Sequence, residues 1–131
     1  MILKELKINT FIGEPTNCYI IYDQESKETM CIDPAGDVEK IFFNLMEKKQ
    51  VYPDVIIVDP PRKGLDNNTI NNILAVKPKK VVYISCNPAT MVRDMKQLNE
   101  NYEIGNIQPV DMFPFTSHVE CVAVLQLKQD V

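Results

Sequence analysis

The sequence predicts an α/β fold, a doubly wound sheet with helices on both faces, preceded by an N-terminal β-meander. Two observations favour this class. From Gly36 to about Leu98, strand-like and helix-like segments alternate, which is typical of sheets whose strands are joined by helices. Residues 1–35 instead contain short strand-like runs separated by polar turns, with no helical period.

Three strands are expected in the N-terminal segment. Residues 3–11 alternate loosely between apolar and polar side chains, residues 18–22 are β-branched or aromatic, and residues 29–32 form a short apolar run. Polar turn residues at 13–17 and 23–27 separate them. Because short turns join consecutive strands, we expect an antiparallel meander.

The period then changes to that of a helix. Apolar residues recur at helical spacing over residues 38–48, and Asp37 is a candidate N-cap. Residues 54–59 form a continuous apolar strand, of the kind that is buried on both faces of a parallel sheet. With the strand over residues 29–32 they predict a right-handed βαβ unit. A helix over residues 68–76 and a second buried strand over residues 81–85 follow.

A last helix and two strands complete the predicted sheet. Asn87 and Pro88 supply an N-cap and a proline at the first helical position, so a helix is expected to begin there. Its predicted inner face consists of Met91, Val92, Met95 and Leu98. Strands expected over residues 103–110 and 119–127 follow without an intervening helix, which favours an antiparallel pair at one edge of the sheet.

Composition limits the classes of function. Because the net charge is −4, RNA binding would need a local basic patch, for which Arg62-Lys63 and residues 77–80 are the candidates. The second cluster is equally well explained as solvated loop charges. A single histidine and the absence of a Cys-x-x-Cys pair argue against a zinc site, and no metal is expected. No apolar run approaches the ~20 residues of a membrane span. With no secretory signal pattern, we expect a cytoplasmic protein without membrane contact.

Cys86 is the first candidate catalytic residue. It lies where the strand over residues 81–85 gives way to the helix that begins near Pro88. The partial positive charge of a helix N-terminus stabilises a thiolate, which is the nucleophilic form of cysteine. The alternative is a small buried apolar residue, which is the commoner role of a lone cysteine.

Two further features suit chemistry. Glu120 begins an otherwise apolar strand, where partial desolvation would make its carboxylate a better base. Taken alone, a strand-edge residue facing water is the commoner explanation. The segment Asp59-Pro60-Pro61-Arg62 follows a buried strand, and its prolines fix the direction in which the chain leaves the sheet. Such a loop suits the wall of a nucleoside pocket, although a rigid turn with an exposed basic pair explains it as well.

Three segments together resemble the RNA uracil-C5 methyltransferases. They are residues 59–64 (DPPRKG), 85–90 (SCNPAT) followed by Arg93-Asp94, and 113–121 (FPFTSHVEC), in the order and approximate spacing of that family. The resemblance covers residues from about 36 to 131, and three ordered motifs make it specific. It implies the C-terminal part of a catalytic domain, with a truncated Rossmann-like methyltransferase sheet.

The resemblance also implies a reaction. In this family a cysteine thiolate adds to C6 of uracil, C5 takes a methyl group from S-adenosylmethionine, and a base removes the C5 proton. By motif match, Cys86 would be the nucleophile and Glu120 the base. The cofactor and uracil site would be lined by Asp59, Pro60, Pro61, Arg62, Asn87, Pro88 and His118. The implied substrate is a uridine of ribosomal or transfer RNA, flipped out of its stack.

The chain differs from that family upstream of the motifs. No segment matches the family's glycine-rich cofactor turn, because the four glycines are far apart: Gly13, Gly36, Gly64 and Gly105. We therefore expect a fragment that is inactive by itself. Two alternatives remain open, a half-enzyme completed by a partner chain and a non-catalytic α/β interaction module. A shortened sheet with an exposed edge also favours a homodimer.

Residues 1–35 resemble a different family. Leu6, residues 17–21 (NCYII) and Ile32-Asp33-Pro34 are similar to the opening strands of metallo-β-lactamase-fold hydrolases, without that family's metal-binding histidine motif. We therefore expect two segments, 1–35 and 36–131, joined near residues 34–37. The strand over residues 29–32 would then take the sheet position of the missing cofactor-binding strand and cover the edge of its neighbour.

Overall fold

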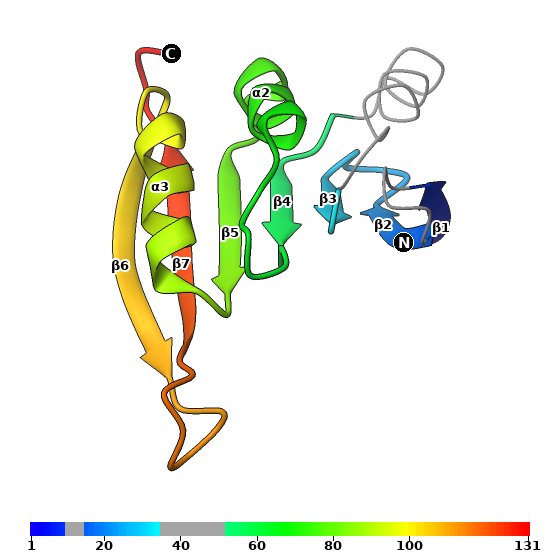
Figure 1. Ribbon diagram of the computed structural model, residues 1–131. Helices are drawn as coiled ribbons and strands as arrows, with labels where there is room; N and C mark the ends of the chain where they lie inside the picture. The colour runs from blue at the N-terminus through cyan, green and yellow to red at the C-terminus, as the bar shows by residue number, and fades with distance from the viewer. Residues whose placement is uncertain (10–14, 35–51) are drawn as a thin grey trace.

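The computed structural model describes residues 1–9, 15–34 and 52–131. Their strands are β1 (Ile2–Asn9), β2 (Pro15–Tyr22), β3 (Thr29–Ile32), β4 (Val55–Val58), β5 (Lys80–Ser85), β6 (Tyr102–Val110) and β7 (Glu120–Leu127). The described helices are α2 (Asn67–Val76) and α3 (Pro88–Leu98). All seven strands form one sheet in the order β1-β2-β3-β4-β5-β7-β6 (Figure 1). The predicted α/β class is confirmed, and the element ends differ from expectation by only a few residues.

The N-terminal strands extend the sheet as predicted. β1, β2 and β3 form an antiparallel meander, and β3 then runs parallel to β4, with Cys31 opposite Ile56. β3 therefore covers the edge that β4 would otherwise expose. The helix predicted over residues 38–48 lies outside the described residues, and so does the junction after residue 34.

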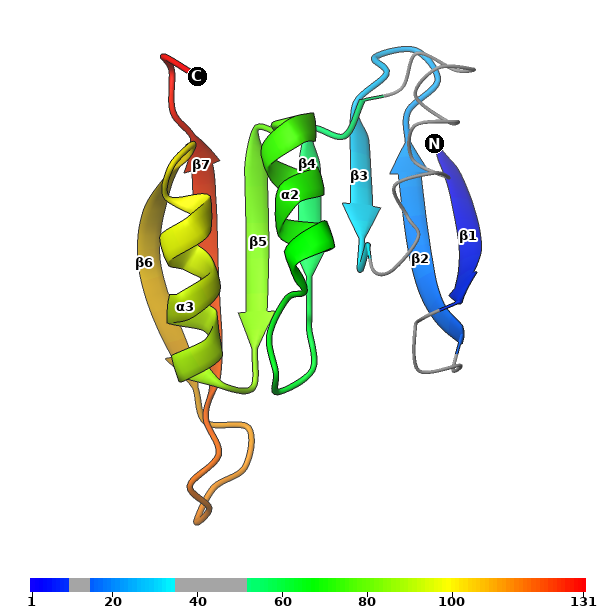
Figure 2. The same cartoon turned by 45° about the horizontal axis from the view of Figure 1, so that its top comes forward.

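The C-terminal strands form the predicted antiparallel pair. β7 runs antiparallel to β5, and β6 pairs with β7 alone at the outer edge, with an irregular register between Ile104 and Ile107. The loop between β6 and β7 extends past the sheet, at the end where β4 and β5 finish (Figures 1 and 2). Nothing in the described strands tests the homodimer, which stays a prediction.

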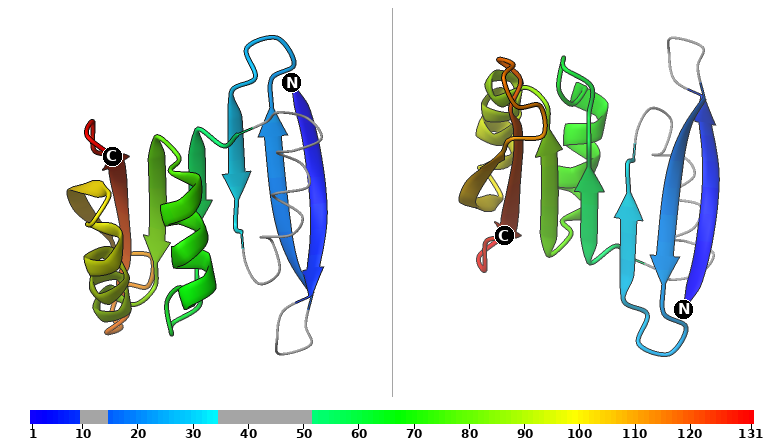
Figure 3. Two further views of the ribbon diagram at one scale, coloured as in Figure 1. Left: turned by 90° about the horizontal axis from the view of Figure 1, so that it is seen from above. Right: turned by 90° about the horizontal axis from the view of Figure 1, so that it is seen from below.

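The core lies between the sheet and the two described helices, which share one face of it (Figure 3). Met91, Met95 and Leu98 of α3 are buried, but Val92 is 46% exposed, so its predicted place on the inner face was wrong. Asp94 takes that place and is fully buried. The predicted burial of β4 is complete on the face of Ile56 and Val58, whereas Val55 and Ile57 on the other face are half-buried. Helix cover on the second face stays a prediction.

Deleting residues 1–35 is expected to give a chain that is insoluble or melts without cooperativity. The deletion removes β3, so β4 would present unpaired backbone groups along an apolar edge. Soluble yield and thermal unfolding followed by circular dichroism measure the effect. Deleting residues 1–9 is the matched control, because it removes only the outermost strand. A soluble, cooperatively melting 1–35 deletion would contradict the structural role of β3.

Candidate functional site

Cys86 occupies the bend between β5 and α3, as the sequence predicts. Asn87 is the N-cap of α3, and its side chain accepts a hydrogen bond from the backbone N–H of Ala89 at 3.2 Å. Ser85 holds the bend, because its hydroxyl donates to the Asn87 carbonyl at 2.9 Å and accepts from the Asn87 N–H at 3.0 Å. Cys86 is only half-buried, whereas the other three cysteines are buried. An accessible thiol next to the N-terminus of α3 suits a nucleophile better than a core residue.

Glu120 lies at the same end of the sheet as Cys86. Ser85 of β5 pairs with Cys121 of β7, and this is the last pair of their antiparallel register. Cys86 follows Ser85 and Glu120 precedes Cys121, so both lie next to this last pair. Glu120 is the first residue of β7 and is half-buried. Both predicted catalytic residues therefore lie at the same end of the sheet, and their roles stay predictions.

The segment from Asp59 to Arg62 leaves β4 at this same end. β4 is parallel to β5, with Val58 opposite Tyr83, so the two strands end at the same end of the sheet. Asp59 is exposed, and its backbone N–H donates to Asp33 Oδ1 at 3.4 Å. Pro60 is buried and Pro61 exposed. The Pro61 carbonyl accepts the N–H of Gly64 at 2.8 Å, which closes the turn.

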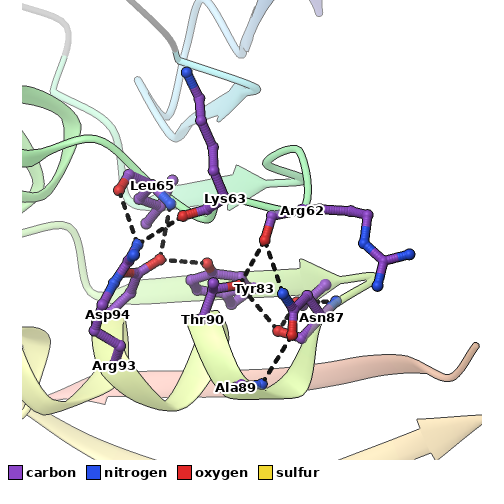
Figure 4. A network of polar contacts seen from close by, with 10 residues as sticks. Arg62, Lys63, Leu65, Tyr83, Asn87, Ala89, Thr90, Arg93 and Asp94 are labelled. Carbon is purple, nitrogen blue, oxygen red and sulfur yellow. Dashed lines mark hydrogen bonds and ion pairs between the residues drawn. The ribbon is translucent and has the colours of Figure 1, made fainter.

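Two side chains at the start of α3 hold this turn in place (Figure 4). The carbonyl oxygen of Arg62 accepts hydrogen bonds from Asn87 Nδ2 at 3.0 Å and from Thr90 Oγ1 at 3.1 Å. Because Asn87 also caps α3, the loop that follows β4 and the residues that flank Cys86 share one set of hydrogen bonds. Asn87 is thus held next to Cys86, and Pro88 begins the helix beside it. That Asn87 and Pro88 line a binding site stays a prediction.

The second half of the loop is tied to α3 through Asp94. Asp94 Oδ2 accepts the backbone N–H of Leu65 and the hydroxyl of Tyr83, both at 2.7 Å. Asp94 Oδ1 accepts two bonds from the Arg93 guanidinium, which also donates to the Lys63 carbonyl at 2.8 Å. Burial, and next the hydrogen bond to Asp94, raise the pKa of the Tyr83 phenol well above its usual value, so it remains a donor. We call these contacts the Asp94 network.

The Asp94 network was not predicted from the sequence. Its signal is nevertheless present, because Asp94 falls between Met91 and Leu98 at the spacing of the buried face of α3. A charged residue at such a position is rarely fully buried unless it has partners. The pattern could have identified Asp94 as a structural acid, but not Tyr83 as its partner.

A direct contact joins the loop to the segment before β7. Arg62 Nη1 donates to His118 Nδ1 at 3.1 Å, since a guanidinium has no acceptor, and both side chains are exposed. Arg62 and Lys63 thus form a basic patch beside the candidate site. The other candidate basic cluster, residues 77–80, lies at the opposite end of the sheet. There Lys79 forms an ion pair with Asp54 at 2.7 Å. Solvated charges are the better interpretation of that second cluster.

The two glycines that the structure describes, Gly64 and Gly105, do not form a cradle for a nucleoside cofactor, and Gly13 and Gly36 lie outside the described residues. A side-chain carbon at Gly64 would meet Asp94 Oδ2 at 2.5 Å, and one at Gly105 would meet the Val124 carbonyl at 2.7 Å. Neither glycine leaves open space for a ligand. Asp33 lies at the carboxyl end of β3 and has a left-handed backbone conformation. Burial raises the pKa of its carboxyl group. Within the described ranges, no group of three or more acidic, cysteine or histidine side chains could hold a metal ion.

Residues 52–131 and the two described stretches before them contain no helix long and apolar enough to cross a membrane.

Known proteins are similar to this chain over the region that carries the three motifs. The sequence model of the tRNA (uracil-5-)-methyltransferase family matches residues 42–128. An uncharacterized RNA methyltransferase of Listeria innocua is 60% identical over 82 residues, which cover 62% of this chain and 18% of that protein. A second, from Listeria monocytogenes, is 57% identical over 117 residues, covering 82% of this chain and 26% of that protein.

A solved structure extends the likeness to the fold. The crystal structure of Pyrococcus abyssi tRNA (uracil-54, C5)-methyltransferase in complex with S-adenosyl-L-homocysteine aligns with a TM-score of 0.52 and 36% identity. The alignment covers 72% of this chain and 27% of that chain. The predicted Rossmann-like methyltransferase sheet is therefore confirmed.

These matches show the family while leaving other expectations untested. The chain spans only about a fifth to a quarter of the length of the curated relatives it matches. The likeness of residues 1–35 to another family, and the division at residue 35, stay predictions. The family match covers well over half of the chain and includes all three motifs. The chain therefore belongs to the tRNA (uracil-5-)-methyltransferase family.

Proposed function

We propose that this chain activates a uridine of RNA for substitution at C5, with Cys86 as the nucleophile and Glu120 as the general base. The observation that carries the proposal is the register between β5 and β7. Its last pair, Ser85 with Cys121, is flanked by the half-buried thiol of Cys86, at the N-terminus of α3, and by the half-buried carboxylate of Glu120. A nucleophile beside a base is what an addition–elimination reaction needs.

The proposed steps need only these two side chains and water. The Cys86 thiolate forms a bond to C6, and the electron pair of the C5=C6 double bond passes into an enolate. C5 of the enolate then takes up a proton from solvent. Glu120 removes the original C5 proton, the C5=C6 bond re-forms and the thiolate leaves. The net result is exchange of the C5 hydrogen of uracil with water.

The surrounding residues have supporting roles in this proposal. Asp59, Pro60 and Pro61 line one side of the space before Cys86, and Asn87 and Pro88 line the other. Arg62 and His118 offer polar groups to the carbonyls or phosphate of the bound nucleotide. Their contact at 3.1 Å and the hydrogen bonds to the Arg62 carbonyl support this placement.

Methyl transfer is a separate step from this exchange, and it is the activity that we expect the chain to lack by itself. The family resemblance points to S-adenosylmethionine as the donor, which would supply the methyl group to C5. Because the described glycines do not form a nucleoside cradle, we assign no step of methyl transfer to the described residues. We propose that this transfer depends on a further polypeptide segment, either in the same protein or in a partner. The proposed substrate is a uridine of transfer or ribosomal RNA in the cytoplasm.

Hydrogen exchange at C5 tests this function without a methyl donor. The pure chain is incubated with RNA that carries tritium at C5 of uridine, and release of tritium to water is counted. We expect release by the unmodified chain and only background release by Cys86→Ala. Glu120→Gln should slow release by about 100-fold or more, the usual contribution of a general base.

Cys121→Ala is the matched control for this experiment. Cys121 is the next residue after Glu120, but it is buried and faces the core. Its substitution should leave tritium release close to that of the unmodified chain. Release that persists in a folded Cys86→Ala variant would contradict the proposed nucleophile, and absence of release by the unmodified chain would contradict the function.

A further inference from the structure

The loop between β6 and β7, residues 111–119, exposes apolar side chains beside the proposed site. Met112 and Phe113 are more than half exposed, and Phe115 is fully exposed. Single exposed apolar residues are ordinary, but a phenylalanine ring with no contact at all from its own chain gains nothing from folding. We call residues 111–119 the aromatic loop.

The backbone of the aromatic loop makes Phe115 an unfavourable residue for its position. The Phe113 carbonyl accepts the N–H of Thr116 at 3.2 Å, which closes a four-residue turn. Proline is second in this turn, and Phe115 is third with φ of 65°. A left-handed third position after proline is typical of type II turns, where glycine or asparagine is preferred. Both the backbone and the exposure therefore disfavour phenylalanine, and such strain often marks a functional position.

The rest of the loop is held in a defined shape close to basic side chains. The Thr116 hydroxyl donates to the Phe113 carbonyl at 2.7 Å and accepts the N–H of His118 at 3.2 Å. His118 in turn contacts Arg62 at 3.1 Å. The loop lies beyond the carboxyl ends of β4 and β5, at the end of the sheet that carries Cys86 (Figures 1 and 2).

We propose that Phe115 stacks on an unpaired RNA base next to the uridine that enters the site, while Arg62 and Lys63 contact the backbone phosphates. The proposal rests on the proposed function, since it places the RNA that holds the target. Exposed aromatic rings next to cationic side chains are the usual platform for single-stranded nucleic acid. The observations favour RNA over a protein partner, because the loop that carries the ring is joined through His118 to the cationic side chain of Arg62.

The chain contains no tryptophan, which makes a direct test possible. Phe115→Trp introduces a single indole whose fluorescence is quenched when a base stacks on it. The probe is a short uridine-rich single-stranded RNA, titrated against the full chain. Tyr52→Trp is the matched control, because Tyr52 is also exposed but precedes β4, at the opposite end of the sheet. We expect saturable quenching of Phe115→Trp and none of Tyr52→Trp.

A second variant separates binding from folding. Phe115→Gly suits the left-handed backbone, so its thermal stability should equal or exceed that of the unmodified chain. Its affinity for the labelled RNA, measured by fluorescence anisotropy, should fall on the order of 10-fold, because stacking on one base is lost. Duplex RNA of the same sequence should bind more weakly than the single strand.

Three results would overturn the proposal. They are an unquenched Phe115→Trp variant in the presence of bound RNA, equal quenching at both indole positions, and unchanged RNA affinity of Phe115→Gly. Quenching of Phe115→Trp that appears with protein concentration alone would indicate a protein contact in place of RNA. Intact tritium release together with unaltered RNA affinity of Phe115→Gly would refute the inference and leave the proposed function standing. Absence of release by the unmodified chain would instead contradict the proposed function.

Discussion

Replacing Asp94 with alanine is expected to lower the free energy of unfolding by about 3 kcal/mol, because two buried donors would lose their acceptor. These are the backbone N–H of Leu65 and the hydroxyl of Tyr83, each 2.7 Å from Asp94 Oδ2. Arg93 loses its partner as well, but its side chain is 53% exposed and can turn to water. Since domains of this size are stable by only about 5–15 kcal/mol, the change is large. Denaturant unfolding measures it.

Two further variants show whether the loss comes from the Asp94 network. Tyr83→Phe removes a single hydroxyl donor and should cost about 1–2 kcal/mol, less than Asp94→Ala. Glu100→Ala removes an exposed acid and should change stability by no more than about 0.5 kcal/mol. A loss below about 1 kcal/mol for Asp94→Ala would show that the buried carboxylate is not what ties the loop to α3.

Gly64→Ala is expected to cost about 2–4 kcal/mol, from two separate causes. Gly64 has φ of 80°, which an alanine adopts only with strain. The added carbon would also meet Asp94 Oδ2 at 2.5 Å and Arg93 Nη2 at 2.6 Å. The arginine end can move aside, but the carboxylate is held by its own hydrogen bonds, so the clash falls on the Asp94 network.

The double variant Gly64→Ala/Asp94→Ala distinguishes the two causes. Without the Asp94 carboxylate, the carbon added at Gly64 no longer meets an oxygen at 2.5 Å. The loss in free energy of unfolding of the double variant should therefore be smaller than the sum of the losses of the two single variants. We expect a coupling of about 1 kcal/mol or more in a cycle of denaturant unfolding measurements. Strict additivity would mean that backbone strain alone explains the cost at Gly64 and that the close approach to Asp94 is relieved freely.

Local patterns predicted most of the described fold. The N-cap at Asn87 and the proline after it marked the start of α3, since both residues have strong positional preferences. The absence of a helix between the last two strands predicted their antiparallel pairing at the sheet edge. The apolar run of β4 was read correctly as a strand, but its burial depends on which helices cover it, and the run itself does not encode that.

The candidate site was predictable only in part. The motifs singled out Cys86 and Glu120 separately, but their place at the same end of the sheet follows from the register of β5 with β7, a long-range pairing that neither segment specifies alone. The Asp94 network joins α3 to residues about 30 positions earlier, at Leu65 and Lys63. The left-handed backbone of Phe115 breaks the usual residue preference for its turn, so no preference rule could have predicted it.

The central claim, that Cys86 attacks uracil, is tested most directly by looking for the covalent bond itself. In Glu120→Gln the adduct that has taken up a proton at C5 should accumulate, because elimination of the thiolate from this species requires removal of a C5 proton. The variant is incubated with uridine-containing RNA, digested with nuclease and protease, and examined by peptide mass spectrometry. A uridine mass on the peptide that contains Cys86, absent from Glu120→Gln/Cys86→Ala, is the predicted result. A folded, RNA-binding Glu120→Gln variant with no adduct, or with the adduct on another cysteine, would contradict the account.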